Sequence, residues 1–186
     1  MTQESRPLGD LEQSGGNWRL CFVRHLDHPI DKVWSAITLP EQRQQWFPTQ
    51  IVGELRPGAK LSFEHPSIPT FDGEVLVCEP PRVLELRWGP DIILFEIEGA
   101  PGGSTLTLTH TFGEHGKAAR DAAGWHECID TLESVVSGET PTWAAGERLA
   151  EVHPSYMESF GPDASTVERP GEMLDSGVNT ERVNES

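Results

Sequence analysis

The feature that most constrains this chain is a long amphipathic helix near the end of its apolar sequence. Between Gly116 and Ser137, apolar residues recur every three or four positions, which is typical of one helical face about five turns long. These positions are Ala118, Ala122, Trp125, Ile129, Leu132 and Val136. Gly138 follows, and glycine commonly lies just past a helix end. A helix of this kind must bury its apolar face against another layer of structure.

Short strands before this helix supply that layer. Ser104–Phe112 alternates strictly, so Leu106, Leu108 and His110 share one face with Phe112, and four threonines share the other. Proline- and glycine-rich turns separate further predicted strands over residues 18–26, 51–55, 60–65, 73–79, 82–88 and 91–98. Among these turns, Arg56-Pro57-Gly58-Ala59 favours a type II turn. Short strands with tight connections predict an antiparallel meander.

Two short helices are predicted after the first strand. Pro29 opens the first, and Ile30, Val33, Trp34 and Ile37 form its apolar stripe. The second runs from Pro40 through Trp46-Phe47 and ends at Pro48. The sequence therefore predicts an α+β fold in which a curved antiparallel sheet of six to seven strands packs on a long C-terminal helix.

Composition divides the chain into four parts. Residues 1–16 have few large apolar side chains and are predicted to form a flexible arm, whereas residues 17–139 form the folded domain. Residues 140–161 are predicted to be a helical extension that Pro154 interrupts. Residues 162–186 are rich in Gly, Pro, Ser and acidic residues, and are predicted to be a disordered acidic tail.

Charge excludes several functions. The chain has 30 acidic and 14 basic residues, a formal net charge of −16, which argues against binding to nucleic acid or to an anionic membrane surface. Its apolar runs are too short for membrane insertion, and its first residues do not resemble a signal peptide. Its three cysteines, Cys21, Cys78 and Cys128, are widely spaced and odd in number. Together these features predict a cytoplasmic protein without disulfides.

The order of several short motifs resembles a known family. The motifs begin with His28-Pro29, Val33-Trp34, Trp46-Phe47-Pro48 and Pro57-Gly58, and continue with Pro80-Pro81 ahead of Trp88, Leu106-Thr107-Leu108-Thr109-His110, and Gly124-Trp125. Over about residues 17–139 they are similar to the activator of heat-shock-protein-90 ATPase homologue-like family. That family lies in the START-like superfamily, with the Bet v 1 allergens, the polyketide cyclases and the calicheamicin-resistance-type proteins.

The resemblance implies a helix-grip fold with a deep apolar cavity between sheet and long helix. Superfamily members bind lipids, hormones, polyketides or aromatic compounds, and a minority catalyse cyclisation or hydrolysis. The eukaryotic co-chaperone of the family has a basic motif and an asparagine-rich motif that this sequence lacks. A chaperone partner is therefore unsupported by motif.

The predicted ligand contacts are the large apolar residues of the inward faces, together with one buried polar residue. They are Trp46, Phe63, Trp88, Phe95, His110, Trp125 and Ile129. His110, on an apolar face, is either a structural histidine or the polar group that orients a ligand. A third interpretation makes it a general base.

Other chemistries have weaker support in the sequence. His25 and His28 flank Asp27, but a strand end followed by Pro29 does not place the two imidazoles on one face, so no metal site is expected. The cysteines lie within apolar patterns, and no Gly-x-Ser-x-Gly motif is present. Asp91, Glu96 and Glu98 are interpreted as solvated charges, and no cofactor is expected.

The sequence thus favours non-catalytic binding of a small apolar ligand, either lipid-like, polyketide or aromatic. One alternative is a protein-interaction module associated with chaperones and the stress response. Another is an enzyme of the cyclase or hydrolase type that uses His110.

Overall fold

Eight strands form one antiparallel sheet in the computed structural model, which describes residues 6–167. Their order across the sheet is β1-β2-β8-β7-β6-β5-β4-β3. The strands are β1 (Asp10–Ser14), β2 (Asn17–Leu26), β3 (Gln50–Val52), β4 (Lys60–His65), β5 (Ile68–Glu79), β6 (Val83–Trp88), β7 (Asp91–Ala100) and β8 (Gly103–Phe112). Only the pairing of β2 with β8 joins strands far apart in the sequence.

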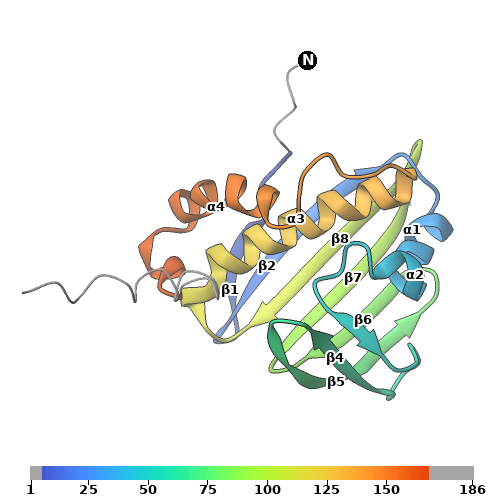
Figure 1. The fold of residues 1–186 in the computed structure, drawn as a ribbon, viewed down its shortest axis with the longest axis horizontal. Helices are drawn as coiled ribbons and strands as arrows, with labels where there is room; N and C mark the ends of the chain where they lie inside the picture. The colour runs from blue at the N-terminus through green and yellow to red at the C-terminus, as the bar shows by residue number, and fades with distance from the viewer. Residues whose placement is uncertain (1–5, 168–186) are drawn as a thin grey trace, which may run out of the picture.

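Helices lie mainly on one face of this sheet (Figure 1). They are α1 (Ile30–Thr38), α2 (Pro40–Arg43), the 3-10 turn η1 (His115–Lys117), α3 (Ala118–Ser137), α4 (Glu147–Phe160) and the 3-10 turn η2 (Pro162–Ser165). The long helix α3 crosses the concave face of the sheet, and α4 packs on α3 (Figure 1). Within residues 6–167, no helix has the length and apolar character needed to cross a membrane.

The core forms where β8 faces α3. Along β8, Leu106, Leu108 and His110 are buried while the intervening threonines are half-buried on the other face, as the alternation predicts. On α3 the buried positions include Trp125, Ile129 and Leu132, which belong to the predicted stripe. Gly138 ends the helix in the left-handed conformation, with φ of 73°. The predicted α+β helix-grip fold is confirmed.

The sheet has one strand more than the six to seven predicted, because residues 10–14 form β1. Gly15 and Gly16 have φ of 59° and 85°, which is the backbone that a two-residue hairpin turn requires. Asp10 therefore pairs with Cys21, and Ser14 with Asn17. The predicted flexible arm is wrong for residues 10–14, and residues 1–5 lie outside the described residues.

The segments after α3 also differ from expectation. Pro154 lies inside α4 without ending it. Proline has no N–H to donate to the Ala150 carbonyl, but both residues face solvent, so that carbonyl is not buried without a partner. Past α4, Ala164 is fully buried and the Val167 N–H donates to the Gly116 carbonyl at 3.1 Å. The predicted disordered tail is therefore wrong for residues 162–167, and residues 168–186 lie outside the described residues.

Smaller differences concern element ends. The predicted turn at Arg56–Ala59 is present, with Gly58 at φ of 79° and Ala59 N–H bonded to the Arg56 carbonyl. β5 begins at Ile68 rather than Gly73 and has a register shift between Val75 and Val77. The second short helix ends at Arg43, and irregular turns carry the chain on to Trp46 and Phe47.

Candidate ligand-binding cleft

A cleft of about 690 Å³ lies beside α3, between this helix and the loop that follows α2. The loop contributes residues 45–49, and Trp88 enters from the end of β6. Helix α3 contributes Arg120, Gly124 and Cys128 among others, while the segment between α3 and α4 contributes Trp143. This volume lies in the range typical of small-molecule sites.

Four large aromatic residues meet at the cleft, and we call them the aromatic cluster: Trp46, Phe47, Trp88 and Trp125. The ring of Phe47 lies 5.5 Å from Trp46, 6.4 Å from Trp88 and 5.7 Å from Trp125, between ring centroids. Trp88 and Trp125 are 5.7 Å apart. The Trp46 indole N–H donates to the Ala36 carbonyl at 2.8 Å, which fixes the loop after α2 against α1. The cluster therefore presents a preformed, mainly apolar wall.

The α3–α4 linker, residues 138–146, forms another wall and is anchored by one carboxylate. Glu127 of α3 accepts hydrogen bonds from Gly146 N–H and Leu149 N–H, both at 2.8 Å. Gly146 occupies the N-cap position of α4 and has no side chain with which to cap it. Glu127 supplies that cap from a neighbouring helix, and so holds the linker over the cleft.

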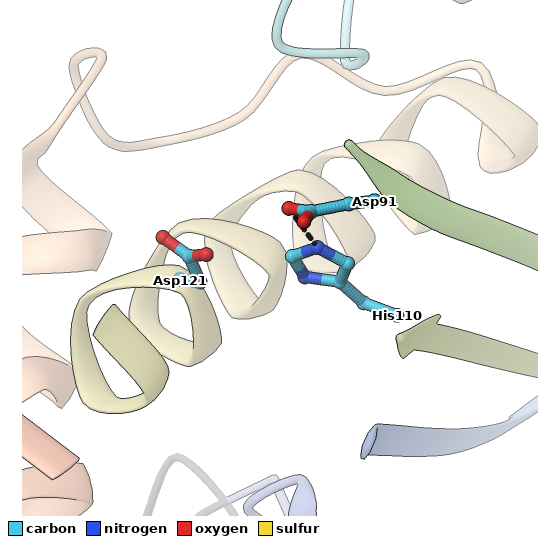
Figure 2. A group of neighbouring side chains, drawn as sticks. All are labelled: Asp91, His110 and Asp121. Atoms are coloured by element: carbon cyan, nitrogen blue, oxygen red, sulfur yellow. Dashed lines mark hydrogen bonds and ion pairs between the residues drawn. The ribbon is translucent and has the colours of Figure 1, made fainter. Parts of the chain in front are cut away.

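His110 lies behind the aromatic cluster and is fully buried. Its Nδ1 accepts a hydrogen bond from the Trp125 indole N–H at 3.1 Å, and its Nε2 lies 2.9 Å from Asp91 Oδ2 (Figure 2). Because an indole nitrogen can only donate, His110 Nδ1 must be the unprotonated nitrogen, and Nε2–H donates to Asp91. Both ring nitrogens are thus engaged inside the protein.

Asp91 is the buried carboxylate of this group, with the ammonium of Lys117 against the same oxygen that faces His110. Burial acts to raise the pKa of Asp91, but hydrogen bonds from His110 and Lys117 outweigh it and leave the pKa below its usual value. The sequence-based interpretation of Asp91 as a solvated charge is wrong. Asp91 faces inward because it continues the buried series Ile93, Phe95 and Ile97 along β7.

Asp91, His110 and Asp121 each offer a ligand atom, and these atoms lie within 4.8 Å of one another (Figure 2). The Lys117 ammonium takes the place that a metal ion would have in this group, since it contacts Asp91 and lies 3.4 Å from Asp121. Moreover, the His110 nitrogen that faces Asp91 carries a proton. The arrangement is that of an internally neutralised ion pair rather than a metal centre.

The charges on the cleft wall are also engaged. Arg120 bonds Asp121 through two nitrogens, at 2.9 and 2.8 Å. Glu127 is occupied by the linker, as described above. Burial, with a smaller effect of Glu127, raises the pKa of the Cys128 thiol to about 12, so this cysteine is a poor nucleophile.

Three of the seven predicted contact residues, Trp46, Trp88 and Trp125, line the cleft. The other four are at most 2% exposed and pack in the core between sheet and helix: Phe63, Phe95, His110 and Ile129. None of these four lines the cleft, and their role as ligand contacts stays a prediction. The open volume lies nearer the rim, around the loop after α2.

Several wall residues were not predicted. Phe47 adjoins the predicted Trp46, so its aromatic character was a usable signal. Thr49 and Cys128 carried none, because their place depends on how the loop and α3 meet. Trp143 lies in the predicted extension, where a large aromatic residue among polar ones indicates docking.

A second polar cluster lies where α4 and the N-terminal segment meet α3. The Tyr156 hydroxyl accepts from Gly9 N–H at 2.9 Å and lies 2.8 Å from Nδ1 of His126. His126 Nε2 is 3.5 Å from Asp130, which also pairs with Arg148 at 2.9 Å. Burial lowers the pKa of His126 to about 4, so the ring is neutral at physiological pH and accepts the Tyr156 proton. This cluster joins α3, α4 and the segment before β1.

The model of the family described as activator of Hsp90 ATPase homolog 1-like protein matches residues 27–137, more than half of the chain. The chain belongs to this family. The match spans the segment from the start of α1 to the end of α3, and therefore every strand from β3 to β8. No curated protein matches the sequence.

Solved structures share the fold. A conserved protein of unknown function from Enterococcus faecalis, EF2215, has a TM-score of 0.67 at 24% identity, over 81% of this chain and 89% of that one. CalU16 from Micromonospora echinospora, solved by NMR, has a TM-score of 0.67 at 20% identity, over 94% of this chain and 99% of that one. MLL2253 from Mesorhizobium loti has a TM-score of 0.58 at 20% identity, over 64% and 97%. The family match and these neighbours together show that the fold is shared.

Proposed function

We propose that this protein binds a small, apolar, ring-containing molecule in the cleft beside α3 and does not transform it chemically. The observation that carries the proposal is the aromatic cluster, which offers ring faces and edges to a preformed cleft of about 690 Å³. Aromatic pairs gain from edge-to-face and offset contacts beyond the area they bury. A flat ring compound can use such contacts more fully than a flexible lipid chain.

The environment of His110 supports binding rather than catalysis. A general base must reach the proton that it removes, directly or through one water molecule. His110 is fully buried, it is absent from the cleft wall, and Trp125 and Asp91 occupy its two nitrogens. Cleft cysteine Cys128 has a raised pKa, which disfavours a thiolate nucleophile.

A larger side chain introduced on the cleft wall tests the proposal. Gly124 lies on the wall, and a Cβ placed there would meet only Leu149, at 3.9 Å, so a side chain can be added without a clash at its base. Gly124→Phe is expected to fill the cleft and to abolish binding of the neutral fluorescent probe N-phenylnaphthylamine. Gly124→Ala is the matched control, and it should keep the affinity while stabilising α3 by about 1 kcal/mol. Equal probe binding by the phenylalanine variant, with its fold intact, would place the site elsewhere.

A further inference from the structure

A second hollow, of about 530 Å³, adjoins the cleft at the loop after α2. Four residues line both the cleft and this hollow: Phe47, Pro48, Thr49 and His65. Because the same residues form a wall of each, no more than the thickness of one residue separates the two spaces. A substituent on a ring bound in the cleft can therefore reach the second hollow past the exposed side chain of His65.

The residues that line only the second hollow differ in character from the aromatic cluster. They are Gln44, Gln50, Glu64, Pro66 and Thr70, and all of them are exposed. Gln50 of β3 and Glu64 of β4 are cross-strand partners, so their side chains lie next to each other. Within residues 6–167, no hydrogen bond or ion pair engages the side chains of Gln50, Glu64 and Thr70. The second hollow thus offers accessible amide, carboxylate and hydroxyl groups, whereas the cleft offers rings.

We infer that the ligand is a ring compound with an uncharged, hydroxylated arm, and that its ring lies in the cleft while its arm lies in the second hollow. This inference rests on the proposed function and specifies the substituent of the ligand. Small-molecule sites commonly combine an apolar wall with a few polar groups that fix the orientation of the ligand. Amide and hydroxyl side chains both donate and accept hydrogen bonds, as the hydroxyl groups of such an arm do.

His65 adds a donor where the cleft meets the second hollow. Its Nδ1 accepts a hydrogen bond from Ser67 N–H at 3.0 Å, so Nδ1 carries no proton. The proton of the neutral ring is therefore on Nε2, which can donate to a hydroxyl oxygen of the arm.

The charges of the second hollow disfavour a charged arm. Its lining residues include no lysine or arginine, so a carboxylate arm would lose hydration without gaining a cation. Glu64 is the one acid among them, and it is exposed. An ion pair between an exposed carboxylate and an ammonium group adds little affinity in water. Several neutral hydrogen bonds therefore outweigh what a cationic arm would gain from Glu64.

Four naphthyl ethers that differ only in the arm test this inference. The methyl ether has no arm, and the glycerol ether has a neutral diol. Two analogues of the glycerol ether carry a terminal ammonium in place of the terminal hydroxyl, or a carboxylate in place of the terminal CH2OH. Calorimetry on the full chain should show the glycerol ether binding at least about fivefold more tightly than the methyl ether, the ratio typical of one hydrogen bond. The carboxylate should bind at least about fivefold more weakly than the glycerol ether, and the amine no more tightly than it.

Two substitutions test the place of the arm. Gln50→Ala and Thr70→Ala alter exposed residues that line the second hollow but not the cleft, so both variants should fold. In the double variant, the affinity of the glycerol ether relative to the methyl ether should fall below about twofold. Gln13→Ala is the control, because Gln13 is exposed on β1, at the opposite edge of the sheet from β3, and it should leave this ratio unchanged. In NMR spectra of the unaltered chain, the amide of Glu64 should shift with the glycerol ether and not with the methyl ether.

The outcomes distinguish the arm from the ring. If the glycerol ether binds no more tightly than the methyl ether, or if it keeps its advantage in the double variant, the second hollow does not hold the arm, although the proposed function stands. If the amine or the carboxylate binds most tightly, the inferred uncharged arm is wrong. If the methyl ether itself does not bind, the proposed function fails, and this inference fails with it.

Discussion

At the scale of single residues, one series of hydrogen bonds joins the buried polar groups between α3 and the strands β7 and β8. Trp125 donates to His110, His110 donates to Asp91, and Asp91 is balanced by Lys117. Each donor therefore meets an acceptor, which is what a buried polar chain needs in order to stabilise the fold. These hydrogen bonds also fix the ring of Trp125, and with it part of the aromatic cluster.

Removing the charge of Asp91 should show how much the stability of the fold depends on this series of hydrogen bonds. Asp91→Asn leaves the half-buried Lys117 ammonium without its nearest counter-charge, so the free energy of unfolding should fall by about 2–3 kcal/mol. Glu54→Gln is the control. Its carboxylate is exposed and pairs with Arg56 at the surface, so its loss should cost less than about 1 kcal/mol. Urea unfolding measures both, and equal losses in the two variants would contradict this account of Asp91.

The lowered pKa of His126 predicts that the free energy of unfolding depends on pH. Burial lowers its pKa in the folded state to about 4, from 6.5 in the unfolded chain, although the facing Asp130 acts in the opposite direction and Arg24, Arg148 and Arg6 act with burial. The unfolded chain therefore binds a proton before the folded one does, and stability is lost as the pH falls from 6.5 toward 4. The loss due to this group should be up to about 3 kcal/mol.

The measurement is the free energy of unfolding across that pH range, for the unaltered chain and for His126→Gln. The variant starts less stable at neutral pH, but its curve should be flatter between pH 6.5 and 4. An NMR titration of the His126 ring that shows a midpoint near 6.5 would refute the assignment.

Sequence patterns predict the burial and the partners of single residues only in part. The alternation of β8 places His110 inward, and that prediction is confirmed by its burial. Its partner Asp91 was missed because residues 92–95 are apolar on both faces, so the inward face could not be chosen from the sequence. The burial of the Thr49 hydroxyl was equally hidden, because it depends on how the loop after α2 packs.

At the scale of elements, the linker between α3 and α4 depends on Glu127 more than on its own sequence. Gly146 adopts a left-handed conformation with φ of 83° and cannot cap α4. Glu127→Gln retains one acceptor oxygen but replaces the other with an amide NH2 group, which can only donate, so one of the two bonds to Gly146 and Leu149 is lost. The loss of about 1 kcal/mol should speed hydrogen exchange at these amides about fivefold.

Glu158→Gln provides the comparison, because Glu158 lies on the exposed face of α4. Exchange at Gly146 and Leu149 should be the same in this variant as in the unaltered chain. If Glu127→Gln also leaves exchange unchanged, the carboxylate does not anchor the linker.

Elements with a clear period were predicted well, and short or irregular ones were not. The positions of β8 and α3 follow from their alternation and their apolar stripe. β1 was missed because five largely polar residues carry no period, although Gly15-Gly16 is a hairpin signal. Pro154 was expected to break α4, but packing of Val152 and Tyr156 on the domain holds the helix on both sides of it.

At the scale of the whole molecule, the resemblance to a family supplied what periodicity could not. The pairing of β2 with β8 connects residues that are far apart in the sequence, such as Leu20 and His110, and no local pattern specifies it. The motif order implied the helix-grip arrangement, and the fold confirms it (Figure 1). The position of the cleft, in contrast, could not be predicted from the motif order. It depends on how far the core fills the space between sheet and helix, which side-chain volumes decide only after packing.

The predicted cytoplasmic location, the absence of nucleic-acid binding and the alternative of a chaperone partner stay predictions. The central claim, in contrast, can be tested directly. It is that the space beside α3, bounded by the aromatic cluster and the linker, receives an apolar ring compound.

The most direct measurement is an N–H NMR titration of the labelled full chain with naphthalene. The account predicts shifts confined to the cleft wall, which are the amides of residues 45–49, of residues 124–128 and of the linker, with saturation as ligand is added. Unchanged spectra up to the solubility limit of naphthalene, or shifts centred on the threonine face of β8, would contradict it.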